Sequence, residues 1–270
     1  MRNKCTRKDG SPCPALDATS PSSLQETNAA LYRRKLCGAL AASGLACALA
    51  LPRLGAETGR YTKIAASADG TGKAYMGREI AGVMGWQGAA WLERNEREKE
   101  ERSDLLLREL ALRPGMDVAD IGAGTGYYAR RIAPLVGPTG TVFAVDVQSE
   151  MIAMLVEMAK KARLHNIKPV LGAEDNVKLA DASIDLAIMV DVYHELAWPY
   201  EVIQSVVRAL RPGGRIAYVE YRAEDPRVPI KPVHKMSEAQ IRKEAAGHEL
   251  VYERTASTLP WQHVVFFRKS

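Results

Sequence analysis

A glycine-rich turn between an apolar strand and a helix constrains this chain more than any other feature. The apolar run Met116–Asp120 leads into Gly122-Ala123-Gly124-Thr125-Gly126, and a helical pattern begins at Tyr128. Glycine lets a backbone come close to a ligand and adopt positive φ values. The helix that follows offers unpaired N–H groups to an anion. The turn therefore predicts a ligand site at the end of this strand.

Strand and helix patterns alternate from this turn to the end of the chain. Such alternation demands a largely parallel sheet covered by helices on both faces, which is a doubly wound α/β fold. Ligands of such folds bind at the carboxyl ends of the strands. Strands are predicted at 116–120, 141–145, 168–171, 184–190, 215–220, 249–252 and 264–268, and helices at 128–136, 150–164, 199–210 and 237–246.

Two segments precede this domain, which we place at residues 113–270. Residues 57–112 are predicted to be a linker up to residue 76, followed by a helical cap that Pro114-Gly115 ends. Within the cap, the charged run 93–102 is predicted to be a solvent-exposed helical face with opposite charges three and four residues apart.

Residues 1–56 are predicted to be a disordered leader that carries a targeting signal. Arg33-Arg34-Lys35 precede an apolar run of 16 residues, 36–51, and small residues follow. The run is shorter than the roughly 20 residues of a membrane-spanning helix. This pattern is typical of a secretory signal, and the paired arginines favour a twin-arginine-like signal with export to the periplasm or an organelle lumen. A two-part organelle-targeting peptide, a membrane anchor and a cytoplasmic extension are the alternatives.

The charges and cysteines divide along the same boundary. The leader holds eight of the 37 basic and three of the 32 acidic residues, so residues 57–270 carry 29 of each sign. A balanced charge disfavours nucleic acid as a partner. All four cysteines, at positions 5, 13, 37 and 47, precede residue 57, so the domain has no thiolate metal site and no cysteine nucleophile.

Acidic residues at the ends of later strands sharpen the prediction. The dinucleotide fingerprint G-x-G-x-x-G does not fit, because its third position is Tyr127. Asp146 lies 20 residues beyond Gly126 at the end of the second strand, where a carboxylate can accept ribose hydroxyls. Glu174-Asp175 follow the third strand, and 210–214 form a sharp turn into the fifth strand.

Together these motifs resemble those of class I S-adenosylmethionine-dependent methyltransferases, in particular the small-molecule type with a seven-stranded sheet. The resemblance implies a Rossmann-like sheet with an antiparallel last strand and S-adenosylmethionine as the cofactor. It further implies that the glycine turn lines the methionine part, that Asp146 binds the ribose and that Glu174 or Asp175 borders the adenine. The predicted cofactor-binding residues are Asp120, Gly122, Ala123, Gly124, Gly126, Asp146, Val147, Glu174, Asp175 and Asp191.

An oxygen or nitrogen methyl acceptor must usually lose a proton, so a histidine or carboxylate near the methyl group is expected. The segments that contain 191–195 and 258–263 converge on the cofactor edge in this fold, and they supply the candidates His194, Glu195 and His263. Arg222 or His234 could hold an anionic group on the acceptor. A metal-dependent variant could be built from His194, Glu195, His234 and His263, but no two histidines have ligand spacing, so the sequence disfavours it and predicts no metal site.

The predicted function is methyl transfer to an oxygen or nitrogen of a small molecule, without nucleic acid and without membrane contact beyond the leader. Two other classes stay open. One is an exported, non-catalytic ligand-binding protein on the same scaffold, and the other is an NAD-dependent oxidoreductase. The sequence carries no signal for an oligomeric state.

Overall fold

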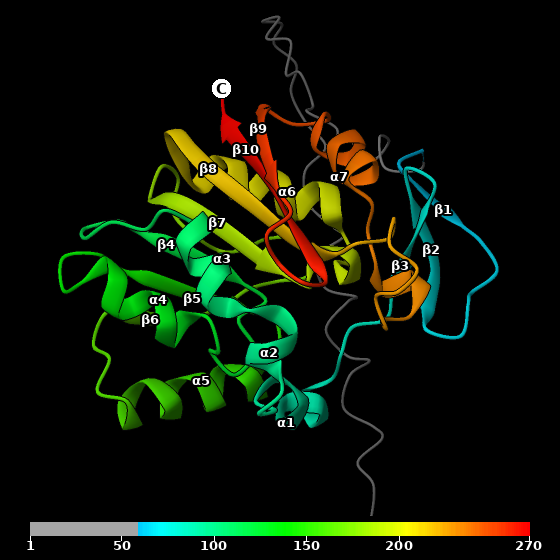
Figure 1. Cartoon of the computed structure of the whole chain (residues 1–270). Coiled ribbons are helices and arrows are strands. Elements are labelled where there is room, and N and C mark those ends of the chain that lie inside the picture. Colours follow the sequence, from blue (N-terminus) through cyan, green and yellow to red (C-terminus); the bar gives the residue numbers. More distant parts are fainter. Residues whose placement is uncertain (1–58) are drawn as a thin grey trace, which may run out of the picture. The chain divides into compact units, whose positions relative to one another are not determined.

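A computed structural model of the chain describes residues 59–270 (Figure 1). The predicted leader and its targeting signal lie outside the described residues. None of the helices within 59–270 combines the length and the apolar character that crossing a membrane requires. The division of the chain at residues 56 and 112 stays a prediction.

A twisted seven-stranded sheet forms the centre of the described part. Its strand order is β6-β5-β4-β7-β8-β10-β9, and all neighbours run parallel except β10, which is antiparallel to both β8 and β9. This confirms the predicted doubly wound, mostly parallel fold with an antiparallel last strand. The strands are β4 (Val118–Ile121), β5 (Val142–Asp146), β6 (Ile167–Leu171), β7 (Ile184–Val190), β8 (Leu210–Tyr221), β9 (Leu250–Ala256) and β10 (Gln262–Lys269).

Helices cover both faces of this sheet and create two hydrophobic cores (Figure 1). Buried side chains recur every four residues on one face of the longest helix, at Met151, Leu155 and Ala159, which presents one apolar stripe to the sheet. One core contains α3 (Ser103–Glu109), α4 (Ala129–Val136) and α5 (Ser149–Lys161), and the other contains α6 (Pro199–Ala209) and α7 (Glu238–Ala245).

The central strands are buried along almost their whole length because helices cover both of their faces. In β7, Leu186 and Ile188 point into one core while Ala187 and Met189 point into the other. The turn predicted at 210–214 is instead the start of β8 and contains a bulge in the ladder. Leu210 pairs with Ile184 and Arg215 with Leu186, so residues 211–214 lie opposite Asp185 alone.

The segment before the glycine turn differs from the prediction. The expected linker and the start of the expected helix form an antiparallel sheet of β1 (Tyr61–Lys63), β2 (Gly70–Tyr75) and β3 (Arg78–Ala81). Short helices follow only afterwards. They are η1 (Trp86–Gly88), α1 (Ala89–Leu92) and α2 (Arg97–Glu101), which precede α3.

Long-range contacts explain why the prediction failed there. The Tyr61 hydroxyl donates to Glu201 of α6, and the Lys73 ammonium donates to the Ala197 carbonyl oxygen at 2.7 Å. These partners are more than a hundred residues away along the chain. The local sequence is rich in Gly, Ser and Thr and has no alternating apolar pattern that would predict strands. The strands form because contacts with distant residues stabilise them.

Candidate functional site

A cavity of about 910 Å³ opens at the carboxyl ends of β4, β5 and β7. This is the edge at which doubly wound sheets bind ligands, and the volume lies within the usual range for small-molecule sites. The wall is mostly apolar. Its polar members include Arg97, Asp120, Asp146, Gln148, Glu174, Asp191, His194, Glu195, Lys231 and His234.

The glycine turn forms one wall of the cavity and is held in conformations that favour glycine. Gly122 and Gly124 have φ values of +69° and +55°. A Cβ atom on Gly122 would lie 2.6 Å from the methyl groups of Val192, and one on Gly124 would lie 2.7 Å from Leu92. A side chain at either glycine would require Val192 or Leu92 to move, so the backbone at Gly122 and Gly124 borders the cavity directly.

Gly126, which was predicted to bind the cofactor, lies away from the cavity. A Cβ atom there would lie 2.4 Å from Met158 of α5. At a φ of +86°, this glycine lets the start of α4 pack against α5. It supports the site through packing.

Asp146 lies at the end of β5, with its carboxylate fixed by backbone N–H groups. One oxygen accepts a hydrogen bond from Gly124 at 2.9 Å and the other accepts one from Gln148 at 2.9 Å. Burial raises the pKa of Asp146, and these hydrogen bonds counteract the shift. Each carboxylate oxygen can accept a further hydrogen bond. The carboxylate is thus oriented on the cavity wall with acceptor capacity left.

The structure separates the two acids that follow β6. Glu174 borders the cavity, whereas Asp175 is exposed and does not. Val147 also borders the cavity and is 45% exposed at its edge. Glu174 is accordingly the acid placed to meet a ligand.

Two further acids, Asp120 and Asp191, lie in the floor of the cavity; Asp120 is buried, and Asp191 is partly buried with one carboxylate oxygen fully enclosed. Burial raises the pKa of Asp120 to about 7, and one of its oxygens has no hydrogen-bond partner among the described residues. Burial, with Glu101 and Glu220 nearby, also raises the pKa of Asp191. With these two acids, the floor of the cavity favours a positive charge. The neighbouring Arg97 supplies part of that charge and opposes the rise in pKa of both acids.

Arg97 corrects the prediction that residues 93–102 form a solvent-exposed face. Arg97 and Glu101 are 5% and 1% exposed, and they form an ion pair at 2.8 Å. The guanidinium lies 4.0 Å from the centre of the Tyr127 ring, a cation–π contact. Tyr127 and Tyr128 directly follow the glycine turn, and the hydroxyl of a buried tyrosine usually needs a hydrogen-bond partner. These two tyrosines were the feature of the sequence that could have indicated buried polar partners such as Arg97 and Glu101.

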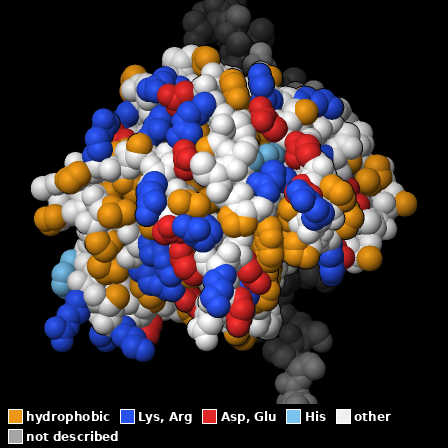
Figure 2. Space-filling model, viewed as in Figure 1, with side chains coloured by type: hydrophobic (Ala, Val, Ile, Leu, Met, Phe, Trp, Pro, Cys, Tyr) orange, Lys and Arg blue, Asp and Glu red, His pale blue; other side chains and the backbone are white. Residues whose placement is uncertain are grey.

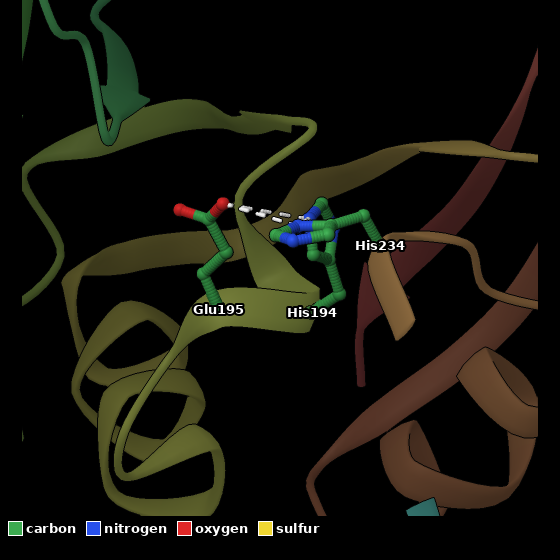
Figure 3. A group of neighbouring side chains, drawn as sticks. All are labelled: His194, Glu195 and His234. Atoms are coloured by element: carbon green, nitrogen blue, oxygen red, sulfur yellow. Dashed lines mark hydrogen bonds and ion pairs between the residues drawn. The ribbon is translucent and has the colours of Figure 1, made fainter. Parts of the chain in front are cut away.

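At the other end of the cavity, His194, Glu195 and His234 lie together (Figure 3). His194 and Glu195 belong to η2 (Tyr193–Glu195), which follows β7, and His234 belongs to η3 (Pro232–His234), which follows β8. A bridge between Arg222 and Met236 turns the chain after β8 back towards the site. We call these three residues the His/Glu cluster.

His194 is oriented by a buried acid. Its Nδ1 atom lies 2.6 Å from a carboxylate oxygen of Glu220, and its Nε2 atom lies 3.1 Å from Nδ1 of His234. Burial disfavours the charged ring, but Glu220 outweighs burial and raises the pKa of His194. The Glu220 contact also directs Nε2 towards the cluster.

His263 lies apart from this site, contrary to the prediction. It is opposite Glu220 in the β8–β10 ladder but does not border the cavity. Only 3% of it is exposed, and burial lowers its pKa. The register of β10 on β8 therefore buries the His263 side chain outside the cavity.

Residues 83–101, which we call the lid segment, close one side of the cavity. The side chain of Gln148 accepts a hydrogen bond from the Trp86 N–H at 2.8 Å and donates to the Met84 carbonyl at 3.0 Å. Glu195 accepts a hydrogen bond from the Met84 N–H at 3.2 Å. Trp91 borders the cavity, whereas Trp86 does not. The lid segment is therefore anchored both beside Asp146, through Gln148, and at the His/Glu cluster, through Glu195.

The strand order, the glycine turn and the acid at the end of β5 together define a class I S-adenosylmethionine-dependent methyltransferase. Comparison with known proteins agrees. The methyltransferase domain family matches residues 112–262, more than half of the chain, and the chain belongs to this family. Its cofactor is S-adenosylmethionine, and the glycine turn, the oriented Asp146 carboxylate and the unpartnered Asp120 oxygen fit such a cation-bearing nucleoside.

Relatives resemble only part of the chain. It is 36% identical over 107 residues to an arsenite methyltransferase of Halobacterium salinarum, covering 40% of this chain and 27% of that protein. It is 29% identical over 111 residues to the ubiquinone/menaquinone biosynthesis C-methyltransferase UbiE of Ectopseudomonas mendocina, covering 41% and 43%. The chain thus spans less than half the length of these relatives.

The fold is also shared with solved structures. A SAM-dependent methyltransferase from Aquifex aeolicus superimposes with a TM-score of 0.66 at 24% identity, over 70% of this chain and all of that one. This likeness confirms the fold, including the expected Rossmann-like sheet. The roles of the individual site residues stay predictions.

Proposed function

We propose that the chain transfers a methyl group from S-adenosylmethionine to an oxygen or nitrogen atom of a small molecule. One observation carries the proposal: a single cavity joins the glycine turn and Asp146 to the His/Glu cluster. A cofactor site and a group of proton-accepting side chains therefore share one enclosed space.

The cofactor half of the cavity contains matched polar groups. Asp146 would accept hydrogen bonds from the ribose hydroxyls, and Glu174 would border the adenine. The backbone of the glycine turn would line the methionine part, with Arg97 beneath it. When bound, S-adenosylmethionine supplies an electrophilic methyl group on a sulfonium, and the protein supplies alignment.

The acceptor half combines apolar walls with the His/Glu cluster. Val83, Pro229 and Ile230 supply apolar wall to the cavity. An oxygen or nitrogen acceptor would lose its proton beside His194, whose Nδ1 is already engaged by Glu220. No cysteine lies within 57–270, so thiolates of this domain do not bind the acceptor.

The surface favours a small molecule over nucleic acid. On the face drawn in Figure 2, basic and acidic side chains are interspersed, and residues 57–270 carry 29 of each sign. A nucleic-acid site would need a basic stripe. The enclosed cavity instead suits a ligand that enters it completely.

Calorimetric titration of the purified full chain with S-adenosylmethionine, S-adenosylhomocysteine and NAD tests the proposal. Both sulfur compounds should bind and NAD should not. Asp146→Asn should weaken binding at least about tenfold, the loss of one hydrogen bond to a charged group, whereas Asp181→Asn, at an exposed position outside the site, should leave it unchanged.

Turnover separates an enzyme from a binding protein. Incubation with methyl-labelled S-adenosylmethionine and a panel of small phenols, amines and carboxylates should yield labelled product and S-adenosylhomocysteine. Tight binding without any product from broad panels would favour the non-catalytic alternative, and preferential binding of NAD would favour an oxidoreductase.

We also propose that the chain is exported. The paired arginines before the apolar run 36–51 support this proposal. Fractionation of cells that express a reporter fused after residue 58 should place the reporter outside the cytoplasm, and replacing Arg33 and Arg34 with lysine should retain it inside.

A further inference from the structure

The donor atoms of the His/Glu cluster lie at the corners of a small triangle (Figure 3). His194 Nε2 is 3.1 Å from His234 Nδ1, and both nitrogens face one oxygen of Glu195, at 3.7 Å and 3.4 Å respectively. Two imidazole nitrogens this close must share a proton or a cation, because two bare lone pairs would repel each other.

The triangle has the dimensions of a tetrahedral metal site. Zn²⁺ binds histidine nitrogen and carboxylate oxygen at about 2.0–2.2 Å, which places neighbouring ligand atoms of a tetrahedral site about 3.3–3.6 Å apart. The three observed separations, from 3.1 to 3.7 Å, bracket that value. A cation could enter with side-chain shifts of a few tenths of an ångström.

The surroundings match those of histidine ligands in metalloproteins. Glu220 holds the opposite nitrogen of His194 at 2.6 Å, and its other oxygen is buried without a partner among the described residues. A carboxylate behind a histidine fixes the ring and strengthens it as a ligand. The nearby cations are already paired, Arg78 with Glu244 at 2.9 Å and Lys231 with Asp69 at 2.7 Å.

We propose that His194, Glu195 and His234 bind one divalent transition-metal ion, for which Zn²⁺ is the best fit. Two nitrogens and one oxygen suit zinc, and a fourth position is open because all three ligands border the cavity. That position faces the acceptor half. The metal would bind the acceptor's oxygen or nitrogen there and lower its pKa, so that with metal bound the proton leaves to solvent and His194 serves as a ligand rather than as the base. This role rests on the proposed methyltransferase function, whereas metal binding itself does not.

The sequence disfavoured this site, although its three residues were among the four weighed for a metal, because the ligands have no short spacing. Glu195 follows His194 directly, but His234 is 40 residues further along the chain. The fold brings the two histidines together through η2 and η3, which follow neighbouring strands of the sheet.

Titration with Co²⁺ tests the site in the full chain. The four leader cysteines are first replaced with serine, so that thiolates cannot contribute. One equivalent of Co²⁺ should bind per chain with the visible absorption of tetrahedral cobalt, and Zn²⁺ should displace it. His234→Gln and Glu195→Gln should lower the affinity at least about tenfold, and Glu220→Gln about ten- to hundredfold. The exposed His165→Gln is the matched control and should bind normally.

Titration of the same samples with S-adenosylmethionine separates the two proposals. Cofactor binding and turnover without stoichiometric cobalt binding would overturn the metal site and leave the methyltransferase function intact. Cobalt binding that survives His234→Gln would likewise overturn it. Cobalt binding at the cluster without cofactor binding would support the metal site and contradict the proposed function.

Discussion

Arg97 is the residue whose replacement tests our description of the site most directly. It pairs with the buried Glu101 at 2.8 Å, donates to the Leu92 carbonyl at 2.9 Å and lies against the Tyr127 ring. Arg97→Met removes the charge while keeping much of the volume. The change leaves Glu101 buried with one remaining guanidinium, that of Arg94 at 2.9 Å.

The expected loss of stability follows from that count of partners. Breaking a buried ion pair by removing one member costs about 3–5 kcal/mol. Since Arg94 still neutralises part of the Glu101 charge, we expect the lower end, about 3 kcal/mol. Urea denaturation of the full chain at neutral pH, followed by circular dichroism, measures this difference in the free energy of unfolding.

A double variant separates lost pairing from lost packing. Arg97→Met combined with Glu101→Leu removes both charges, and apolar replacement of a buried pair is often neutral or stabilising. The double variant should therefore unfold within about 1 kcal/mol of the native chain. If Arg97→Met alone cost less than about 1 kcal/mol, or the double variant were as unstable as the single one, the buried-pair argument would be refuted.

Three other predictions concern the cavity wall. Gly122→Ala should reduce S-adenosylmethionine affinity at least about tenfold in calorimetry, because φ is +69° and the added Cβ meets Val192; unchanged affinity would contradict the tight turn. Burial raises the pKa of Asp120 to about 7 in the folded chain, whereas an unfolded Asp has a pKa of about 3.9. The folded state therefore holds this proton more tightly than the unfolded state, and the free energy of unfolding falls as pH rises from about 4 to 7. Asp120→Asn should hence be more stable than the native chain at about pH 8, by up to about 4 kcal/mol, and the difference should vanish below about pH 4; parallel stability curves would rule this out. Glu174→Gln should weaken cofactor binding a few-fold while Asp175→Asn does not, and equal effects of the two would remove the distinction between them.

The sequence was sufficient to predict the sheet from β4 onward. Alternating apolar patterns are strong where strands are buried on both faces, as in β7, whose predicted bounds 184–190 agree with the structure. Helix ends were also predictable, for example where Gly137 ends α4 with a φ of +67°. Local signals determine these features.

The rest depends on contacts between distant residues. The strands β1 and β2 have no apolar period and are stabilised by partners on and beside α6. The run 93–102 has the composition of an exposed helix, yet the fold buries Arg97 against the two tyrosines after the glycine turn. A single sequence does not show which charged residue will find a buried partner.

The position of β3 bears on how acceptor choice could evolve in this family. Arg78 of β3 binds Glu244 with two nitrogens, at 2.9 and 3.1 Å, and donates to the His194 carbonyl oxygen at 3.0 Å. The small sheet thus helps to fix the backbone beside the His/Glu cluster. On the proposed function, exchange of β1 to β3 alone between relatives would alter which nucleophiles are methylated, while the lid segment, the glycine turn and Asp146 are inherited unchanged.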